Sequence, residues 1–326
     1  MVRGVFLILL LCLGAGLLAA NLIGCDLLAA LTAGPADGDD VAPDGEGTPD
    51  TTDGDTHPGD TDDGAVDGGP AGPFYVNLQV DAETEDTEGI ARMLAELQAR
   101  QLPATVFVTA EYANEHARDV QQWYRNGFEI ALHGFYTGEQ LATMTYDEQL
   151  DLLTRAQQAL EGCRPCGTYK PIIGFRPQYF SQNENTYRVL DQLGMTYNCG
   201  FKHGQLFMDG HESDTAPYLV EGHNFHAVPF TTVTHDDEGI YLCDIAVANV
   251  QQMTGAQWSG VLLTAMQQAY AQGDPFVVLF HGWYTGNTEE YDYWDAFVGL
   301  LDALTQYEPQ YVTTEQLVAA YSEATP

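Results

Sequence analysis

The stretch Tyr-Val-Asn-Leu-Gln-Val-Asp-Ala-Glu at residues 75–83 opens the part of the chain that predicts a fold. Its first six residues are an apolar run typical of a buried strand, and acidic residues follow where that strand should end. Three later apolar runs also end in a polar residue: 129–132 before His133, 172–175 before Arg176, and 276–280 before His281. Polar residues at the carboxyl ends of parallel strands meet on one rim of an α/β barrel, where such barrels keep their chemistry. An acid, an arginine and two histidines on one rim indicate a metal-assisted hydrolase.

Apolar residues at helical spacing alternate with these strands. The pattern predicts helices at 88–101, 115–125, 146–160, 184–193, 258–272 and 291–307, and further strands at 105–109, 195–199 and 311–313. Thr145 and Glu148 predict a capping box, and Ser181 is the expected cap of the helix at 184–193. Residues 201–248 contain only short apolar runs. Alternating strands and helices predict a distorted (β/α) barrel of about seven strands.

The ordered motifs, together with Tyr-Val-Thr-Thr-Glu-Gln-Leu at 311–317, resemble those of the polysaccharide deacetylases, the NodB-homology group of carbohydrate esterases. The resemblance covers roughly residues 73–320. It implies a NodB-like barrel, an extracellular or cell-envelope glycan as partner, and hydrolysis of N-acetyl carbon–nitrogen bonds. It also implies a divalent metal, with zinc favoured.

The resemblance assigns a role to each motif. Asp81 and His133 match metal ligands of the family, and His281 matches the histidine that protonates the leaving amine. In Arg176-Pro-Gln-Tyr179 the arginine should pair with the catalytic base, and the Tyr179 backbone N–H should help to hold the oxyanion.

Two positions depart from the family pattern. Gln79 stands where active members have the acidic general base, and Thr137 stands where they have a second metal-binding histidine. Glu83 or Glu85 could replace the base, and Glu83 could add a ligand oxygen. Other candidates for a third ligand are Thr137, Glu139, His211, His223 and His226. The metal site is therefore expected to be weak or incomplete.

The two histidine segments resemble each other. His-Gly-Phe-Tyr-Thr-Gly at 133–138 is echoed by His-Gly-Trp-Tyr-Thr-Gly at 281–286, which suggests paired loops facing each other across a pocket, although the resemblance could be chance. The aromatic residues Tyr136, Trp283 and Tyr284 could stack on sugar rings or could pack the loops.

The first quarter of the chain has a different composition. Residues 1–25 resemble an export signal, and Leu-Ile-Gly-Cys at 22–25 fits a bacterial lipobox that would make Cys25 a lipidated amino terminus. An uncleaved membrane anchor is the alternative. Residues 26–72 form an acidic Asp/Gly/Pro/Thr linker predicted to be disordered, and 73–326 form the deacetylase-like domain. An exported lipoprotein, bound to the membrane only through its lipid, is expected.

Charge narrows the partners. The formal net charge is −36, and residues 73–326 carry 34 acidic against 10 basic side chains. Such a surface repels nucleic acid and anionic lipid and is compatible with neutral or cationic glycans. Adaptation to salt is an equally good explanation of the charge.

The even set of Cys163, Cys166, Cys199 and Cys243 in a non-cytoplasmic domain favours disulfides, with connectivity left open.

Two functions remain open at this stage. The first is a divergent deacetylase with a degenerate base at Gln79 and a degenerate ligand at Thr137. The alternative is a catalytically inactive glycan-binding lipoprotein on the same fold.

Overall fold

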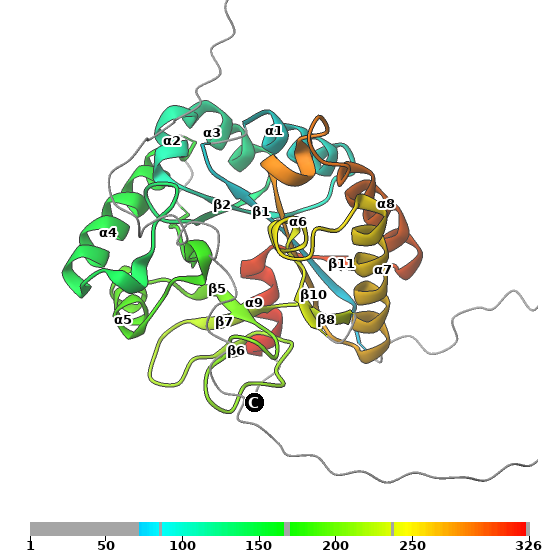
Figure 1. The fold of residues 1–326 in the computed structure, drawn as a ribbon. Coiled ribbons are helices and arrows are strands. Elements are labelled where there is room, and N and C mark those ends of the chain that lie inside the picture. Colours follow the sequence, from blue (N-terminus) through cyan, green and yellow to red (C-terminus); the bar gives the residue numbers. More distant parts are fainter. Residues whose placement is uncertain (1–71, 85–86, 166–169, 236–237, 324–326) are drawn as a thin grey trace, which may run out of the picture. The chain divides into compact units, whose positions relative to one another are not determined.

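Parallel strands and outer helices alternate through a computed structural model that describes residues 72–84, 87–165, 170–235 and 238–323 (Figure 1). The chain divides into two units, Met1–Ala65 and Val66–Pro326, and the described residues belong to the second. The predicted signal segment, Cys25, the linker up to residue 71, Glu85 and Cys166 lie outside the described residues.

A curled, mostly parallel sheet forms the centre of the domain. Its strands are β1 (Tyr75–Ala82), β2 (Thr105–Val108), β3 (Glu129–Leu132), β4 (Gly174–Phe175), β5 (Tyr197–Lys202), β6 (Tyr218–Leu219), β7 (His226–Phe230), β10 (Phe276–His281) and β11 (Gln310–Tyr311). Among the described residues, seven strands run parallel in the order β10-β1-β2-β3-β4-β5-β7, while β6 is antiparallel to β7 and β11 pairs with the start of β1. The predicted barrel of about seven strands is confirmed.

The two ends of the parallel path meet beside β7. The backbone N–H of Thr231 donates to the Val277 carbonyl of β10 at 3.2 Å, and the Val277 N–H donates to the Thr231 hydroxyl at 2.9 Å. Cys243 forms an isolated parallel bridge with Leu279. These contacts join the edges of the curled sheet and give its carboxyl ends a common rim.

Apolar and polar side chains alternate along β1, so the apolar ones face the core and the polar ones face the inside of the curled sheet. Val76, Leu78 and Val80 are fully buried in the apolar layer between the sheet and the helices. Because successive side chains of a strand point to opposite faces, Asn77, Gln79 and Asp81 point to the inner face. A second apolar cluster, including Phe107, Cys199 and Leu279, fills that inner face below the polar residues.

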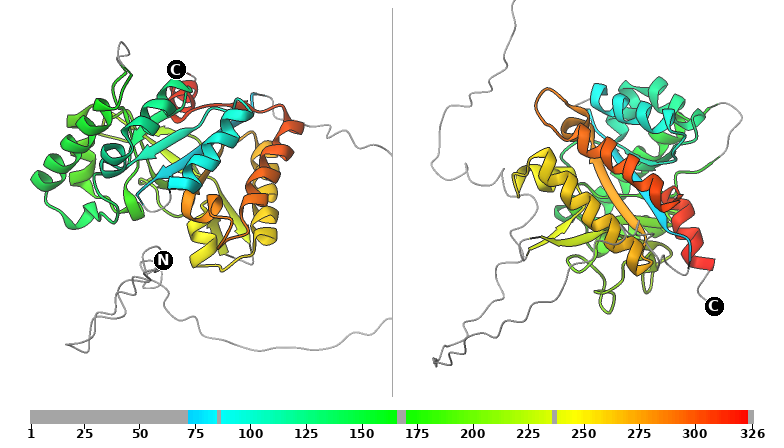
Figure 2. Two further views of the ribbon diagram at one scale, coloured as in Figure 1. Left: turned by 90° about the horizontal axis from the view of Figure 1, so that it is seen from above. Right: turned by 90° about the vertical axis from the view of Figure 1, so that its right-hand side faces the viewer.

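Helices surround the sheet (Figures 1 and 2). They are α1 (Thr87–Ala99), α2 (Ala110–Glu115), α3 (Ala117–Arg125), α4 (Tyr146–Gly162), α5 (Glu184–Leu193), α6 (Asp244–Asn249), α7 (Gly255–Gln272), α8 (Trp294–Leu304) and α9 (Thr314–Glu323). Leu317 and Val318 of α9 pack into the inner apolar cluster, so this last helix covers the interior of the curled sheet. No helix of the described residues is long and apolar enough to cross a membrane.

Local signals explain most helix starts and one error. Thr145 and Glu148 form the predicted capping box of α4. The cap of α5 is Asn183, whose side chain accepts from the backbone N–H groups of residues 185 and 186, so the prediction of Ser181 is wrong. The Ser181 hydroxyl instead accepts from the Ala142 N–H at 3.1 Å, because a short turn separates it from the helix.

Other differences are matters of length and of irregular backbone. The predicted strand at 172–175 contains only Gly174 and Phe175 as a strand. The helix predicted at 115–125 is two helices, because His116 has a non-helical backbone between them. The stretch 201–248 contains β6, β7, α6 and a hairpin of β8 (Thr232–His235) and β9 (Glu238–Tyr241).

Candidate active site

Asp81 lies at the centre of the rim, near the end of β1. Parallel pairing places it beside His281 of β10 and Phe107 of β2. The Asp81 side chain is 4% exposed. A carboxylate at this depth needs partners for both oxygens, since an unpaired buried charge is strongly unfavourable.

Arg176 provides one of these partners, directly after β4. Its Nη2 donates to Asp81 Oδ1, and its Nη1 donates to Gln79 Oε1 at 2.6 Å. The guanidinium also lies 3.8 Å from the centre of the Phe107 ring. Burial lowers the Arg176 pKa to about 9. This value is still above neutral pH, so the side chain stays positively charged there. The arginine therefore bridges Gln79, at the position matched to the family base, and Asp81.

The other oxygen of Asp81 faces both histidines. His133 Nε2 and His281 Nε2 each lie 3.3 Å from Asp81 Oδ2. The two resembling segments thus bring their first residues to one oxygen atom, as paired loops would. Gly134 and Gly138 of the first loop have φ angles of +89° and +96°, while the second loop, 282–286, is a single π-helical turn.

Asp244, at the start of α6, holds His281 in place. Its Oδ1 contacts His281 Nδ1 at 2.6 Å, and its Oδ2 accepts from the His281 backbone N–H at 2.8 Å and from the Thr285 hydroxyl at 2.7 Å. Burial alone would lower the His281 pKa, but the charge and hydrogen bond of Asp244 raise it to about 10. The imidazole is therefore protonated, with its Nε2–H directed at the centre of the rim.

The sequence analysis missed Asp244. It follows Ile240–Cys243, a short apolar run inside the long irregular stretch, so the same rule that selected Asp81 could have selected it. A lone aspartate there carried no further signal.

Glu83 lies next to the two histidines, two residues after Asp81 and just past the end of β1. Its Oε1 is 3.2 Å from His133 Nε2, and its side chain is 26% exposed. Burial raises the Glu83 pKa, but the hydrogen bond from His133 and the charges of His133 and His281 outweigh burial and lower it overall. Glu83 is thus an ionised carboxylate at the open edge of the site.

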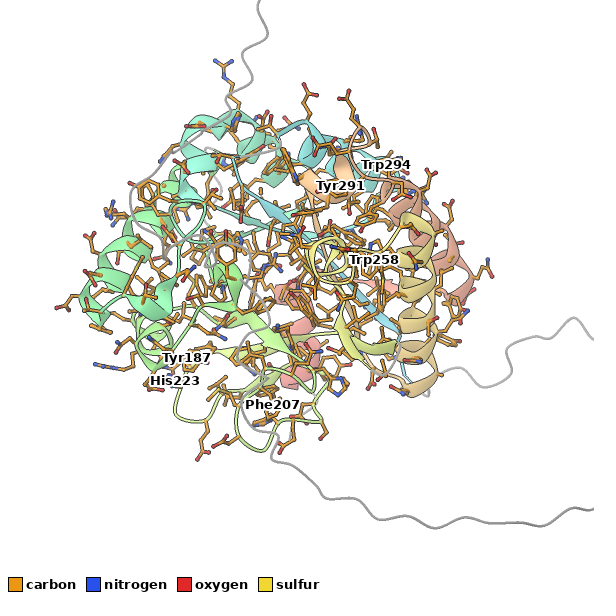
Figure 3. All side chains as sticks on the ribbon, viewed as in Figure 1. Tyr187, Phe207, His223, Trp258, Tyr291 and Trp294 are labelled. Carbon is orange, nitrogen blue, oxygen red and sulfur yellow. The ribbon has the colours of Figure 1, made fainter. Side chains whose placement is uncertain are left out.

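The other candidates for a third metal ligand are engaged elsewhere. Glu139 accepts from the Phe135 and Tyr136 N–H groups, His211 contacts Asp214, His223 contacts Asp191, and His226 contacts Ser322. His223 lies at the periphery against Tyr187 of α5, with the ring centres 5.5 Å apart (Figure 3). None of these four contacts involves Asp81 or His133. Thr137 Oγ1 lies 3.4 Å from Thr84 Oγ1.

One three-residue cluster of potential ligand atoms occurs in the described part of the chain: Cys243, Asp244 and His281, with all atoms within 4.8 Å of one another. Hydrogen bonds to His281 and Thr285 already use the Asp244 oxygens. This arrangement orients His281 and does not require an ion.

The cysteines do not form the expected disulfides. Cys163, Cys199 and Cys243 are all free and buried. Cys199 Sγ accepts from Gln79 at 3.6 Å inside the barrel, and Cys163 Sγ contacts the Ala113 carbonyl at 3.5 Å behind α2. Cys163 lies in the outer apolar cluster, whereas Cys199 and Cys243 lie in the inner one.

The remaining predicted residues lie on the loops of the rim. Tyr179 and Phe180 have φ angles of 54° and 55°, and such left-handed backbone in bulky residues costs energy and clusters at functional sites. Tyr136, Tyr179 and Trp283 are 46%, 50% and 38% exposed. Tyr284 instead accepts from Asn249 at 2.8 Å and packs on Tyr291, so it braces its loop. Stacking of these rings on sugars stays a prediction.

Whether the residues fit a divalent cation depends on His133, which is 3% exposed. Its Nδ1 contacts the Arg176 carbonyl oxygen at 2.9 Å, and because a carbonyl only accepts, Nδ1 carries the hydrogen. Nε2 is then the nitrogen that faces the Asp81 and Glu83 carboxylates. A metal-binding histidine typically donates its other ring N–H to a backbone carbonyl in this way, and a bound cation would take the place of any hydrogen on Nε2. The residues present fit a cation at this position.

The curled parallel α/β barrel is the NodB-like architecture of solved polysaccharide deacetylases. Residues 68–198 match the family model described as polysaccharide deacetylase, which places this part of the chain in that family.

Solved structures share the fold at low identity. A putative polysaccharide deacetylase from Mycobacterium smegmatis is 19% identical with a TM-score of 0.59, and the alignment covers 78% of this chain and 92% of that one. A probable polysaccharide deacetylase from Pseudomonas aeruginosa is 15% identical with a TM-score of 0.63, covering 78% and 92%. A CE4 family pseudoenzyme from Bacillus anthracis is 15% identical with a TM-score of 0.51, covering 76% and 66%. No curated protein sequence matches the chain significantly.

Proposed function

We propose that the domain hydrolyses the amide carbon–nitrogen bond of N-acetyl groups on an extracellular or cell-envelope glycan. The observation that carries this proposal is the His281–Asp244 pair, whose protonated Nε2 points at Asp81 from 3.3 Å. An acid held in this way serves a step in which a leaving group takes up a proton.

The chain's own residues account for the second half of the reaction. As the carbon–nitrogen bond breaks, the amine nitrogen takes the proton of His281, and acetate and a free amino sugar result. Asp244 and Thr285 keep the imidazole oriented throughout. The backbone N–H of Tyr179, in a strained turn, is assigned the part of a preorganised donor that stabilises a developing oxyanion. A divalent cation, when bound, would supply Lewis-acid polarisation of the acetyl carbonyl.

The first half of the reaction, the attack of water on the acetyl carbonyl, has no acidic base at position 79. Gln79 accepts from Arg176, and its amide donates to Asn77 Oδ1 at 2.6 Å, so it cannot take a proton from water. We therefore expect slow turnover.

The buried, hydrogen-bonded state of Gln79 favours a second candidate, a catalytically inactive glycan-binding protein. Gln79 is fully buried and hydrogen-bonded at both ends, like a structural core residue. A CE4 family pseudoenzyme shares the fold, and a solved mutant of a CE4 family pseudoenzyme is described as having restored enzymatic activity.

Acetate release from N-acetylated chito-oligosaccharides by the full chain, measured with added zinc, tests the two candidates. We expect slow release that His281→Ala reduces by roughly 10²–10⁴-fold, the usual value of a general acid. His223→Ala, a histidine change at the periphery, is the matched control and should leave the rate unchanged. Binding of the oligosaccharide without any acetate release would support the glycan-binding candidate instead.

A further inference from the structure

The position of Glu83 bears on the ligand role that the sequence left open for it. Its carboxylate and that of Asp81 both approach His133 Nε2, at 3.2 and 3.3 Å. Two ligand atoms on one tetrahedral metal, each bonded at about 2.0–2.1 Å, are separated by about 3.3 Å. Both separations therefore equal the spacing expected between neighbouring ligands of one ion.

We propose that Glu83 is the third protein ligand of a divalent-cation site formed with Asp81 and His133, in place of the histidine that the family has at the position of Thr137. The role of this cation in catalysis rests on the proposed function. The test of the site measures metal binding alone and does not depend on that function.

The hydrogen bonds around the three residues leave the required atoms facing inward. Arg176 occupies Asp81 Oδ1, so Oδ2 is the oxygen that faces the site. The Arg176 carbonyl fixes the Nδ1 hydrogen of His133, so Nε2 is the nitrogen that faces the site and would bind an ion. Such outer partners orient ligands in metal centres.

The chain path explains why Glu83 can replace a histidine at position 137. Thr137 Oγ1 is 3.4 Å from Thr84 Oγ1, which brings the first histidine loop against the residue next to Glu83. A ligand from residue 83 and one from residue 137 therefore approach the same place from neighbouring backbone. The short threonine leaves that place to the carboxylate.

Charge and mobility agree with this assignment. Three carboxylates, Asp81, Glu83 and Asp244, lie around the site against two cations, Arg176 and His281, and the remaining negative charge favours a cation. As folded, the oxygens of Asp81 and Glu83 are not within 4.8 Å of each other, since these residues form no such cluster with His133. Glu83 is the exposed member at 26%, so its side chain can turn inward when the ion binds.

Cobalt(II) and zinc(II) binding to the full chain in detergent provides the test, by equilibrium dialysis with metal analysis and by the visible spectrum of cobalt. We expect one equivalent to bind, and Glu83→Gln to weaken binding by at least the ~10–100-fold that is lost when a supporting residue is removed. Glu88→Gln, the same change at an exposed position of α1, is the matched control and should bind as the wild type does. Thr137→His in the Glu83→Gln background should restore binding.

Three results would overturn the proposal. One is unchanged affinity in Glu83→Gln, and another is no binding by the wild type at millimolar metal. The third is a cobalt–thiolate absorption band that Cys243→Ser removes, because the ion would then occupy the cluster of Cys243, Asp244 and His281. These experiments measure metal binding and not acetate release. A failure of the proposed hydrolysis is therefore distinguishable from a failure of the proposed metal site.

Discussion

Gln79 stands where the family pattern has its general base, and it contacts Arg176 as that base is expected to do. Its Oε1 accepts from Arg176 at 2.6 Å. In Gln79→Asp a carboxylate would take that place, and the guanidinium charge would keep it ionised. We expect acetate release to rise by roughly 10²–10⁴-fold, the usual value of general-base help.

Gln79→Asn is the matched control, since it has the length of aspartate but cannot take a proton. Equal rates for Gln79→Asp and Gln79→Asn, measured with metal present, would assign the base to another residue.

Glu129 of β3 is a second residue with a testable electrostatic state. It accepts from the Thr105 hydroxyl, the Tyr197 hydroxyl and the Glu315 N–H, at 2.9, 2.7 and 3.0 Å. Burial raises its pKa despite these hydrogen bonds. A raised pKa means that the fold disfavours the charged form, and this penalty appears as the pH rises above the unfolded-state value.

Glu129→Gln should therefore gain stability relative to the wild type between about pH 5 and about pH 8. The tyrosine hydroxyl can accept from the new amide, so the network survives. Thermal unfolding at both pH values measures the trend. Glu148→Gln should show the opposite trend, because hydrogen bonds from Thr145 lower the Glu148 pKa. A difference between Glu129→Gln and wild type that falls as pH rises would contradict the assignment.

At the scale of elements, the loop that carries Trp283 is fixed by contact with α1. A Cβ atom on Gly286 would lie 2.4 Å from the backbone of Gly89. Gly286→Ala must push the loop away from the helix, and we expect a loss of about 1–3 kcal/mol of unfolding free energy, as for other overpacked sites. Gly299→Ala, inside α8 with nothing within 4 Å, is the control and should gain up to about 1 kcal/mol. Chemical denaturation measures both, and equal effects would show that the loop is not held by α1.

The elements also show what the sequence could predict. The strand at 276–280 was predicted because buried parallel strands require a continuous apolar run. The two-residue β4 depends on tertiary contacts that a short segment does not encode, whereas the Asn183 cap of α5 is a local signal that the prediction overlooked. Asp81, His133, Arg176 and His281 were found together because each ends a strand. Asp244 was missed because its segment becomes regular only against β10, and Glu83 stayed ambiguous because nearby acids gave the same local signal.

The whole molecule combines an acidic domain with an amino-terminal segment whose role is read from sequence alone. Residues 73–326 carry a formal charge of −24, so contact with an anionic membrane surface is unfavourable. The predicted membrane attachment would then come from the segment before the domain. The lipobox at 22–25 predicts Cys25 as the lipidated residue.

Cys25→Ala should therefore release the protein from the membrane fraction or stall its processing, because the acyl chains have no other acceptor. Fractionation and the electrophoretic size of the full chain in its bacterial host measure the result. Cys12→Ala is the matched control, since Cys12 lies within the apolar run of the signal and should leave processing unchanged. A Cys25→Ala protein that remains in the membrane fraction at the processed size would mean that another segment anchors it, and the acidic domain would then need a contact strong enough to overcome its own repulsion from the bilayer.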